Sequence, residues 1–193
     1  MAPRRSGAAG LRAEWERVLA GRSKTDRKLL LVGLLNKALG PARRAVLVGG
    51  AAVEFYTSGA YLTGDVDLVC TREDVRRVLL SAGFQEEGRY FLRAEFGLLV
   101  EVPSRDLRPT ETPVLVEFEG LTVPMVAVED AIVDRLLAAK FWRSPTDWEQ
   151  AILLYAAHRG SLDSRALRDK AERNEVSDSL DQLARAVEAD SAA

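Results

Sequence analysis

The chain has 193 residues, of which 47% are apolar and 29% charged, and its formal net charge is −2. This is typical of a globular protein with one packed core, and the absence of any run of 18 apolar residues excludes a membrane-spanning helix. The slight negative charge argues against nonspecific coating of nucleic acid. Cys70 is the only cysteine, which excludes an internal disulfide and a cysteine-based zinc site and favours a cytoplasmic protein.

The N-terminal residues are expected to precede the fold. Residues 1–10 are basic but lack a hydrophobic segment, so they indicate a disordered lead-in and not a secretory signal. Helical periodicity starts at Leu11, and a second, strongly apolar helix is predicted over residues 29–39, ending at Gly40-Pro41. Two helices are therefore expected before the first strand.

Two short segments then carry polar features at the ends of predicted strands. The sequence AVLVGG, residues 45–50, predicts a buried strand, a turn at Gly49-Gly50 and a following helix. Residues 65–70 alternate in polarity, with apolar side chains on one face and Asp65 and Asp67 on the other. The two carboxylates are therefore expected to project side by side.

The rest of the chain predicts more strands and then helices. After a helix over residues 71–80, strands are expected over 89–94 and 97–102, followed by a hairpin that turns at Glu119-Gly120. Pro124 predicts that the last strand is an edge strand or ends there. Helices follow from residue 128 to the C-terminus. Trp142 and Trp148 lie among apolar residues in them and are interpreted as packing residues, the alternative being a platform on which bases stack.

These elements predict an α+β fold with a mixed central sheet of about five strands, flanked by helices. The N-terminal helices and the sheet are assigned to a core over residues 11–126. Residues 127–193 are assigned to a C-terminal helical bundle.

The glycine pair and the aspartates have complementary chemistry. Glycines between a strand and a helix let backbone N–H groups approach a phosphate closely, and the helix N-terminus favours negative charge. Two carboxylates one residue apart on a strand can ligate a hard cation such as Mg²⁺. Together they indicate a site for displacement at a nucleotide phosphorus, in which two metal ions about 3.5–4 Å apart assist the attacking and leaving oxygens.

Each feature also has a purely structural interpretation. A glycine pair alone more often forms a tight turn than a phosphate-binding site. Two aspartates at a strand end are more often solvent-exposed surface charges than metal ligands. Glu101, at the end of a later strand, is either a third metal ligand or a surface charge of an edge strand. The combination of all three features favours the functional interpretation.

The pattern of Gly49-Gly50, Asp65-Val-Asp67-Leu and a later carboxylate resembles the nucleotidyltransferase superfamily of the polymerase-beta type. The segments VGGAAVEFYTSGAYLTGDVDLV, FGLLVEVP and EDAIVDRLLAAKFWRSPTDWEQA are similar to bacterial nucleotidyltransferase-like proteins related to AbiEii-type toxins. This resemblance covers roughly residues 44–158.

The resemblance implies a role for each matching residue. Asp65, Asp67 and Glu101 are expected to be catalytic and to ligate Mg²⁺ or Mn²⁺. Residues expected to bind the nucleoside triphosphate are Gly49, Gly50, Thr63 and Lys140.

The function implied is metal-dependent transfer of a nucleoside monophosphate, from a triphosphate such as ATP to a hydroxyl of RNA, protein or a small molecule. A further interpretation that the resemblance allows, compatible with this activity, is the toxin of a toxin–antitoxin pair with an antitoxin as its partner. The alternative is a catalytically inactive module that uses the same fold to bind a nucleotide or a partner.

Overall fold

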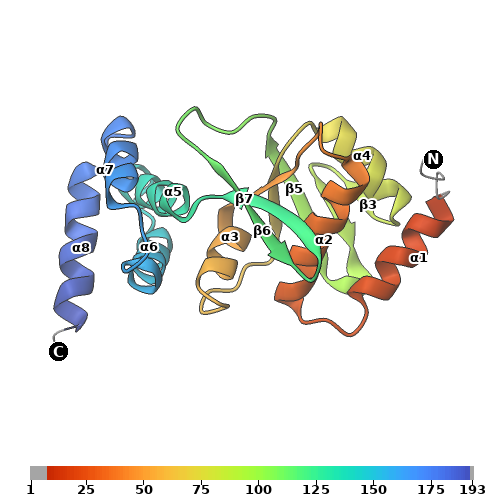
Figure 1. Cartoon of the computed structure of the whole chain (residues 1–193), viewed down its shortest axis with the longest axis horizontal. Coiled ribbons are helices and arrows are strands. Elements are labelled where there is room, and N and C mark those ends of the chain that lie inside the picture. Colours follow the sequence, from red (N-terminus) through yellow and green to blue (C-terminus); the bar gives the residue numbers. More distant parts are fainter. Residues whose placement is uncertain (1–7, 192–193) are drawn as a thin grey trace. The chain divides into compact units, whose positions relative to one another are not determined.

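The computed structural model describes residues 8–191 and divides them into two compact units (Figure 1). The first unit comprises residues 8–51, 63–106 and 114–125, and the second comprises residues 52–62, 107–113 and 126–191. Of the predicted lead-in, residues 1–7 lie outside the described part, and the first helix begins at Ala8. None of the helices between residues 8 and 191 is both long and apolar enough to cross a membrane.

The first unit contains a seven-stranded mixed sheet in the order β3-β4-β5-β2-β1-β7-β6. The strands are β1 (Val46–Val48), β2 (Val66–Val69), β3 (Gln85–Glu87), β4 (Tyr90–Arg93), β5 (Leu98–Ser104), β6 (Pro113–Phe118) and β7 (Leu121–Val126). At its centre β2 pairs antiparallel with β1 and parallel with β5. The mixed sheet with flanking helices is confirmed, although it has seven strands where about five were expected.

Helices α1 (Ala8–Leu19), α2 (Lys24–Leu39) and α4 (Arg72–Ser81) pack against one another in the first unit. Ser23 caps α2, its hydroxyl accepting a hydrogen bond from the Asp26 amide. Helix α2 lies against β7 so closely that a Cβ at Gly33 would be 2.7 Å from the Cβ of Leu121. The core of this unit is apolar, and its fully buried members include Leu31, Leu35, Leu47, Leu68, Phe91, Val100 and Met125.

The short helix α3 (Gly49–Tyr56) follows β1 directly. Its first residue, Gly49, has a φ of 63°, a left-handed conformation that glycine adopts without steric cost. The predicted glycine turn is therefore a single positive-φ step from strand into helix. This step places the backbone amides of the glycine pair at the N-terminus of α3.

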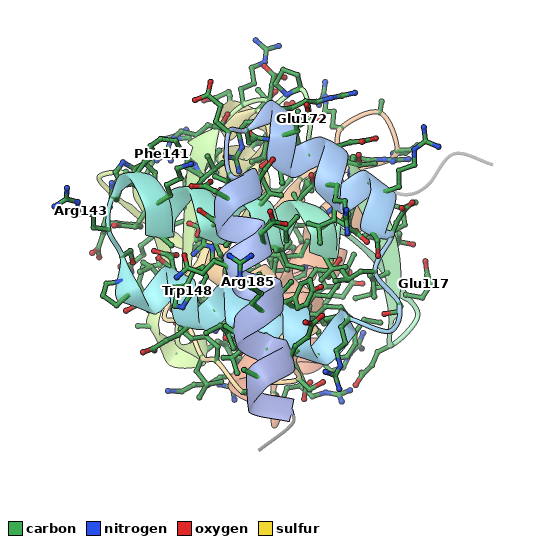
Figure 2. All side chains as sticks on the ribbon, turned by 90° about the vertical axis from the view of Figure 1, so that its left-hand side faces the viewer. Glu117, Phe141, Arg143, Trp148, Glu172 and Arg185 are labelled. Carbon is green, nitrogen blue, oxygen red and sulfur yellow. The ribbon has the colours of Figure 1, made fainter. Side chains whose placement is uncertain are left out.

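The second unit is largely helical. Its four main helices, α5 (Val128–Phe141), α6 (Pro145–His158), α7 (Ser164–Arg173) and α8 (Ser177–Ser191), pack as a bundle. The hydroxyl of Ser144 accepts a hydrogen bond from the Asp147 amide and caps α6, whose first residue is Pro145. Figure 2 shows α8 in front of the other helices, with Arg185 on it.

Two expectations about single residues are wrong. Strand β7 is interior, lying between β1 and β6, so Pro124 is not on an edge strand. The registered pairing of β7 with the three-residue β1 is limited to Leu47 and Met125, and so short a contact leaves room for a residue without an N–H. Trp142 is 81% exposed and is not a packing residue, because α5 ends at Phe141 and leaves the indole beyond the bundle.

Candidate metal and phosphate site

The three carboxylates predicted from the sequence lie together in the first unit. Asp67 is on β2, and its parallel register partner on β5 is Glu101. Asp65 immediately precedes β2. One carboxylate oxygen from each of the three residues can be chosen so that all lie within 4.8 Å of one another, and all three residues are half-buried.

The donor set fits a hard divalent cation. Mg²⁺ binds oxygen ligands at about 2.0–2.1 Å in octahedral geometry, which separates neighbouring ligand oxygens by about 3 Å and opposite ones by about 4.2 Å. Oxygens within 4.8 Å of one another therefore need only small side-chain rotations to share one ion. Mg²⁺ and Mn²⁺ both suit such a donor set, because carboxylate oxygens are ligands that either ion accepts.

The glycine pair borders this cluster. An ideal Cβ at Gly49 would lie 2.3 Å from the Asp67 carboxylate oxygen Oδ2, and one at Gly50 would lie 2.9 Å from the Thr63 hydroxyl oxygen. Both positions therefore exclude a side chain, so the backbone at the start of α3 directly approaches the candidate metal ligand Asp67 and the neighbouring Thr63. The residues predicted to bind phosphate and those predicted to bind the metal ion therefore lie next to one another.

Thr63 belongs to the same cluster. Its hydroxyl donates a hydrogen bond to Oδ1 of Asp65 at 2.8 Å, and its carbonyl oxygen accepts one from Lys28 Nζ at 2.6 Å. Thr63 was expected to contact phosphates, and the contact that the structure shows is with a carboxylate. Its nucleotide-binding role stays a prediction.

Lys140 lies on α5 in the second unit and has partners there. Its ammonium donates hydrogen bonds to the Glu175 carbonyl oxygen and to Oδ1 of Asp178, each at 2.7 Å. Asp147, in the first turn of α6, accepts a hydrogen bond from Arg135 at 2.6 Å. The expected contact of Lys140 with a triphosphate stays a prediction.

Two cations near the carboxylates were not found by reading the sequence. Arg89, in the turn before β4, has its Nε 3.4 Å from Oε1 of Glu101, and its pKa is raised by the Tyr90 hydroxyl and then by the Glu101 charge. Lys28 is only 6% exposed within α2. Strands β4 and β5 pair antiparallel, and Tyr90 is the register partner of Glu101. A hairpin predicted from these two adjacent strands would therefore have placed Arg89, the residue before Tyr90, near Glu101. No sequence signal connects Lys28 with Thr63.

Comparisons with known proteins support the fold. The crystal structure of an antigenic nucleotidyltransferase-like protein from Paracoccidioides brasiliensis is similar, with a TM-score of 0.56 and 18% identity; the match covers 83% of this chain and 91% of the other. No protein-family model matches the sequence, and no curated protein matches it. At this identity the likeness concerns the fold, so we conclude that the chain has a nucleotidyltransferase-like fold.

Proposed function

We propose that this protein is a metal-dependent nucleotidyltransferase that moves a nucleoside monophosphate from a nucleoside triphosphate to a hydroxyl group. The observation that carries the proposal is the gathering of Asp65, Asp67 and Glu101 beside the N-terminus of α3. Metal ligands and a phosphate-binding backbone in one place are what this reaction needs.

In the proposed site, the three carboxylates hold Mg²⁺ or Mn²⁺, and the backbone amides of Gly49 and Gly50 bind the β- and γ-phosphates. The bound metal supplies positive charge that offsets the charge developing on the phosphoryl oxygens. Phosphoryl transfer needs little covalent help from the protein. The contribution of the chain's own residues is therefore to hold the triphosphate and the acceptor hydroxyl in the orientation in which they react.

The bond changes are those of a substitution at phosphorus. The acceptor's hydroxyl oxygen forms a bond to the α-phosphorus, the bond from that phosphorus to the bridging oxygen breaks, and pyrophosphate leaves. The hydroxyl proton passes to a base, for which Glu101 is the proposed residue, since it lies at the cluster and its side chain is 16% exposed.

The acceptor is proposed as a class of hydroxyl compounds that includes RNA, protein and small molecules. The toxin role and its antitoxin partner rest on the sequence resemblance alone. A small helix-turn-helix protein encoded beside this chain, together with growth arrest on expression that requires Asp65, would support them.

An inactive binding module is the second candidate. Three carboxylates drawn together cost free energy through mutual repulsion unless a cation binds them, which favours a metal-dependent function but does not by itself require turnover. The two candidates differ in one observable, the transfer of label from the α-phosphate.

The test is incubation of the protein with each of four α-labelled nucleoside triphosphates, Mn²⁺ or Mg²⁺, and total cellular RNA or protein. Transfer by the wild type and its loss in Asp65→Asn/Asp67→Asn would support the proposal, with an unchanged melting temperature as evidence of folding. Transfer retained in the double variant would contradict the assignment of the site. Binding of a triphosphate without any transfer would favour the inactive module.

A further inference from the structure

A buried lysine lies behind the carboxylate cluster. Lys28 is in the first turns of α2, and only 6% of it is exposed. We propose that Lys28 is a positioning residue that holds Thr63, and through Thr63 the Asp65 carboxylate, in the orientation that binds the metal ion. This inference rests on the proposed function, because it assigns a role within the same metal site.

The contacts form a continuous chain from α2 to the cluster. Lys28 Nζ donates to the Thr63 carbonyl oxygen at 2.6 Å, and the Thr63 hydroxyl donates to Oδ1 of Asp65 at 2.8 Å. Thr63 also packs against Gly50, where an added Cβ would lie 3.0 Å from the Thr63 Cβ. Thr63 is therefore fixed by its carbonyl, its hydroxyl and its methyl-bearing carbon.

The residue next to Thr63 offers no comparable support. Gly64 is exposed, and a Cβ at that position would meet nothing within 4 Å. The segment that leads into β2 is therefore anchored from the α2 side by the lysine. This bond holds the Thr63 carbonyl, and with it the stretch of backbone from which the Thr63 hydroxyl projects toward Asp65.

The direction of the Thr63 hydroxyl bond decides which oxygen of Asp65 is available. A carboxylate oxygen that accepts a side-chain hydrogen bond is held in place, and the second oxygen is then oriented for a ligand. With Oδ1 held by Thr63, Oδ2 of Asp65 is the better placed metal ligand. Groups of this kind behind a metal ligand typically alter metal affinity by about 10–100-fold when they are removed.

Burial of the Lys28 ammonium costs free energy, so its presence in the interior needs a reason. Burying an ammonium group is unfavourable unless hydrogen bonds compensate for the lost water. The neighbouring residues of α2, Leu29 to Leu31, are buried and apolar, so a methionine of similar length would fill the same space without this cost. The contribution of Lys28 therefore lies in its hydrogen bonds.

Positioning and simple electrostatics predict opposite results. Loss of a positive charge near a cation site would by itself tighten metal binding, because like charges repel. Loss of the bond that fixes Thr63 and Asp65 would weaken it. The sign of the change in metal affinity therefore separates the two roles, and protein stability alone does not.

The experiment measures Mn²⁺ affinity by isothermal titration calorimetry in Lys28→Met, Thr63→Val and the double variant, with melting temperatures in parallel. We expect each single variant to weaken Mn²⁺ binding by about tenfold. The double variant should bind about as weakly as either single one, because both changes interrupt the same chain of contacts. Lys37→Met is the matched control: Lys37 lies on the same helix, pairs with Glu14 and has a side chain that is 62% exposed, so Mn²⁺ binding should not change.

Unchanged or tighter Mn²⁺ binding in Lys28→Met would overturn the positioning role, and additive losses in the double variant would overturn the path through Thr63. If Lys28→Met does not fold, Lys28→Arg replaces it. The arginine retains a donor for the Thr63 carbonyl and should bind Mn²⁺ within a fewfold of the wild type, and a tenfold loss would count against the proposal. A wild-type protein that binds no Mn²⁺ would instead refute the proposed function, and with it this inference.

Discussion

The backbone of Gly49 lies against the carboxylate of Asp67, with room for a hydrogen atom and nothing larger. A Cβ at position 49 would be 2.3 Å from Oδ2 of Asp67, well inside van der Waals contact. The contact arises because Val48, the last residue of β1, is the register partner of Asp67 in the antiparallel pair. The strand pairing thus brings the start of α3 to the side chain of Asp67, one of the three candidate metal ligands.

Gly49→Ala is expected to abolish metal binding and transfer. The methyl group must displace the Asp67 carboxylate, and the left-handed φ of 63° adds strain of about 1–2 kcal/mol for a residue with a Cβ. The measurement is Mn²⁺ affinity together with the melting temperature.

Gly97→Ala is the matched control for this substitution. Gly97 has the same φ of 63°, but a Cβ there would meet nothing within 4 Å. It should therefore lower the melting temperature through backbone strain while leaving Mn²⁺ binding intact. Equal effects of the two alanines on Mn²⁺ binding would show that the close approach of Gly49 and Asp67 has no functional role.

Lys140 offers a prediction about the second unit. Since its ammonium bonds to Glu175 and Asp178, we expect both Lys140→Met and Asp178→Asn to lower the melting temperature slightly. The nucleotide-binding role that the sequence resemblance implies predicts a loss of nucleoside triphosphate affinity in Lys140→Met but not in Asp178→Asn. Equal triphosphate affinities in the two variants would contradict that role.

The stability of the second unit should depend on pH through Asp134. Burial alone would raise the pKa of this carboxyl, but Arg135 and Arg108, which both donate hydrogen bonds to it, lower its pKa below the ordinary value. A lowered pKa in the folded state means that the ionised group stabilises the protein above the ordinary value of about 3.9. This contribution is lost as the pH falls through the lower pKa of the folded state.

Asp134→Asn is therefore expected to be less stable than the wild type at pH 7, with a difference that shrinks as the pH falls below about 4. Melting temperatures from pH 7 to pH 3 would measure this convergence. Asp181→Asn, which alters an exposed carboxylate on α8, serves as the control. A difference between Asp134→Asn and the wild type that stays constant over this range would contradict the assignment.

Much of the metal site could be predicted from local sequence patterns. The alternating polarity around Asp65 and Asp67 predicts a strand, and glycines after an apolar strand predict a tight turn into a helix. Both patterns can be recognised because they involve residues that are close in the sequence. Glu101 could be placed only at the end of a later strand, because its register with Asp67 depends on the parallel pairing of β2 with β5, which local patterns do not encode.

Features that depend on tertiary contacts were missed. Strand β3 has only three residues, Gln85–Glu87, all exposed, so it carries no apolar alternation and exists through its pairing with β4. Trp142 follows apolar neighbours in the sequence, but the end of α5 leaves it exposed, and Figure 2 shows Arg143, the next residue, projecting outward at the left edge of the molecule. Lys28 meets Thr63 across 35 residues, which no local pattern encodes.

The most direct test of the metal site is a calorimetric titration of Mn²⁺ into the wild type and into Asp65→Asn, Asp67→Asn and Glu101→Gln. We expect saturable binding by the wild type and a large loss of affinity in every variant. The melting temperatures should not fall, since each neutral amide relieves repulsion among the three carboxylates. Undiminished Mn²⁺ binding in all three variants, or no binding by the folded wild type, would contradict the claim that these carboxylates form a metal site.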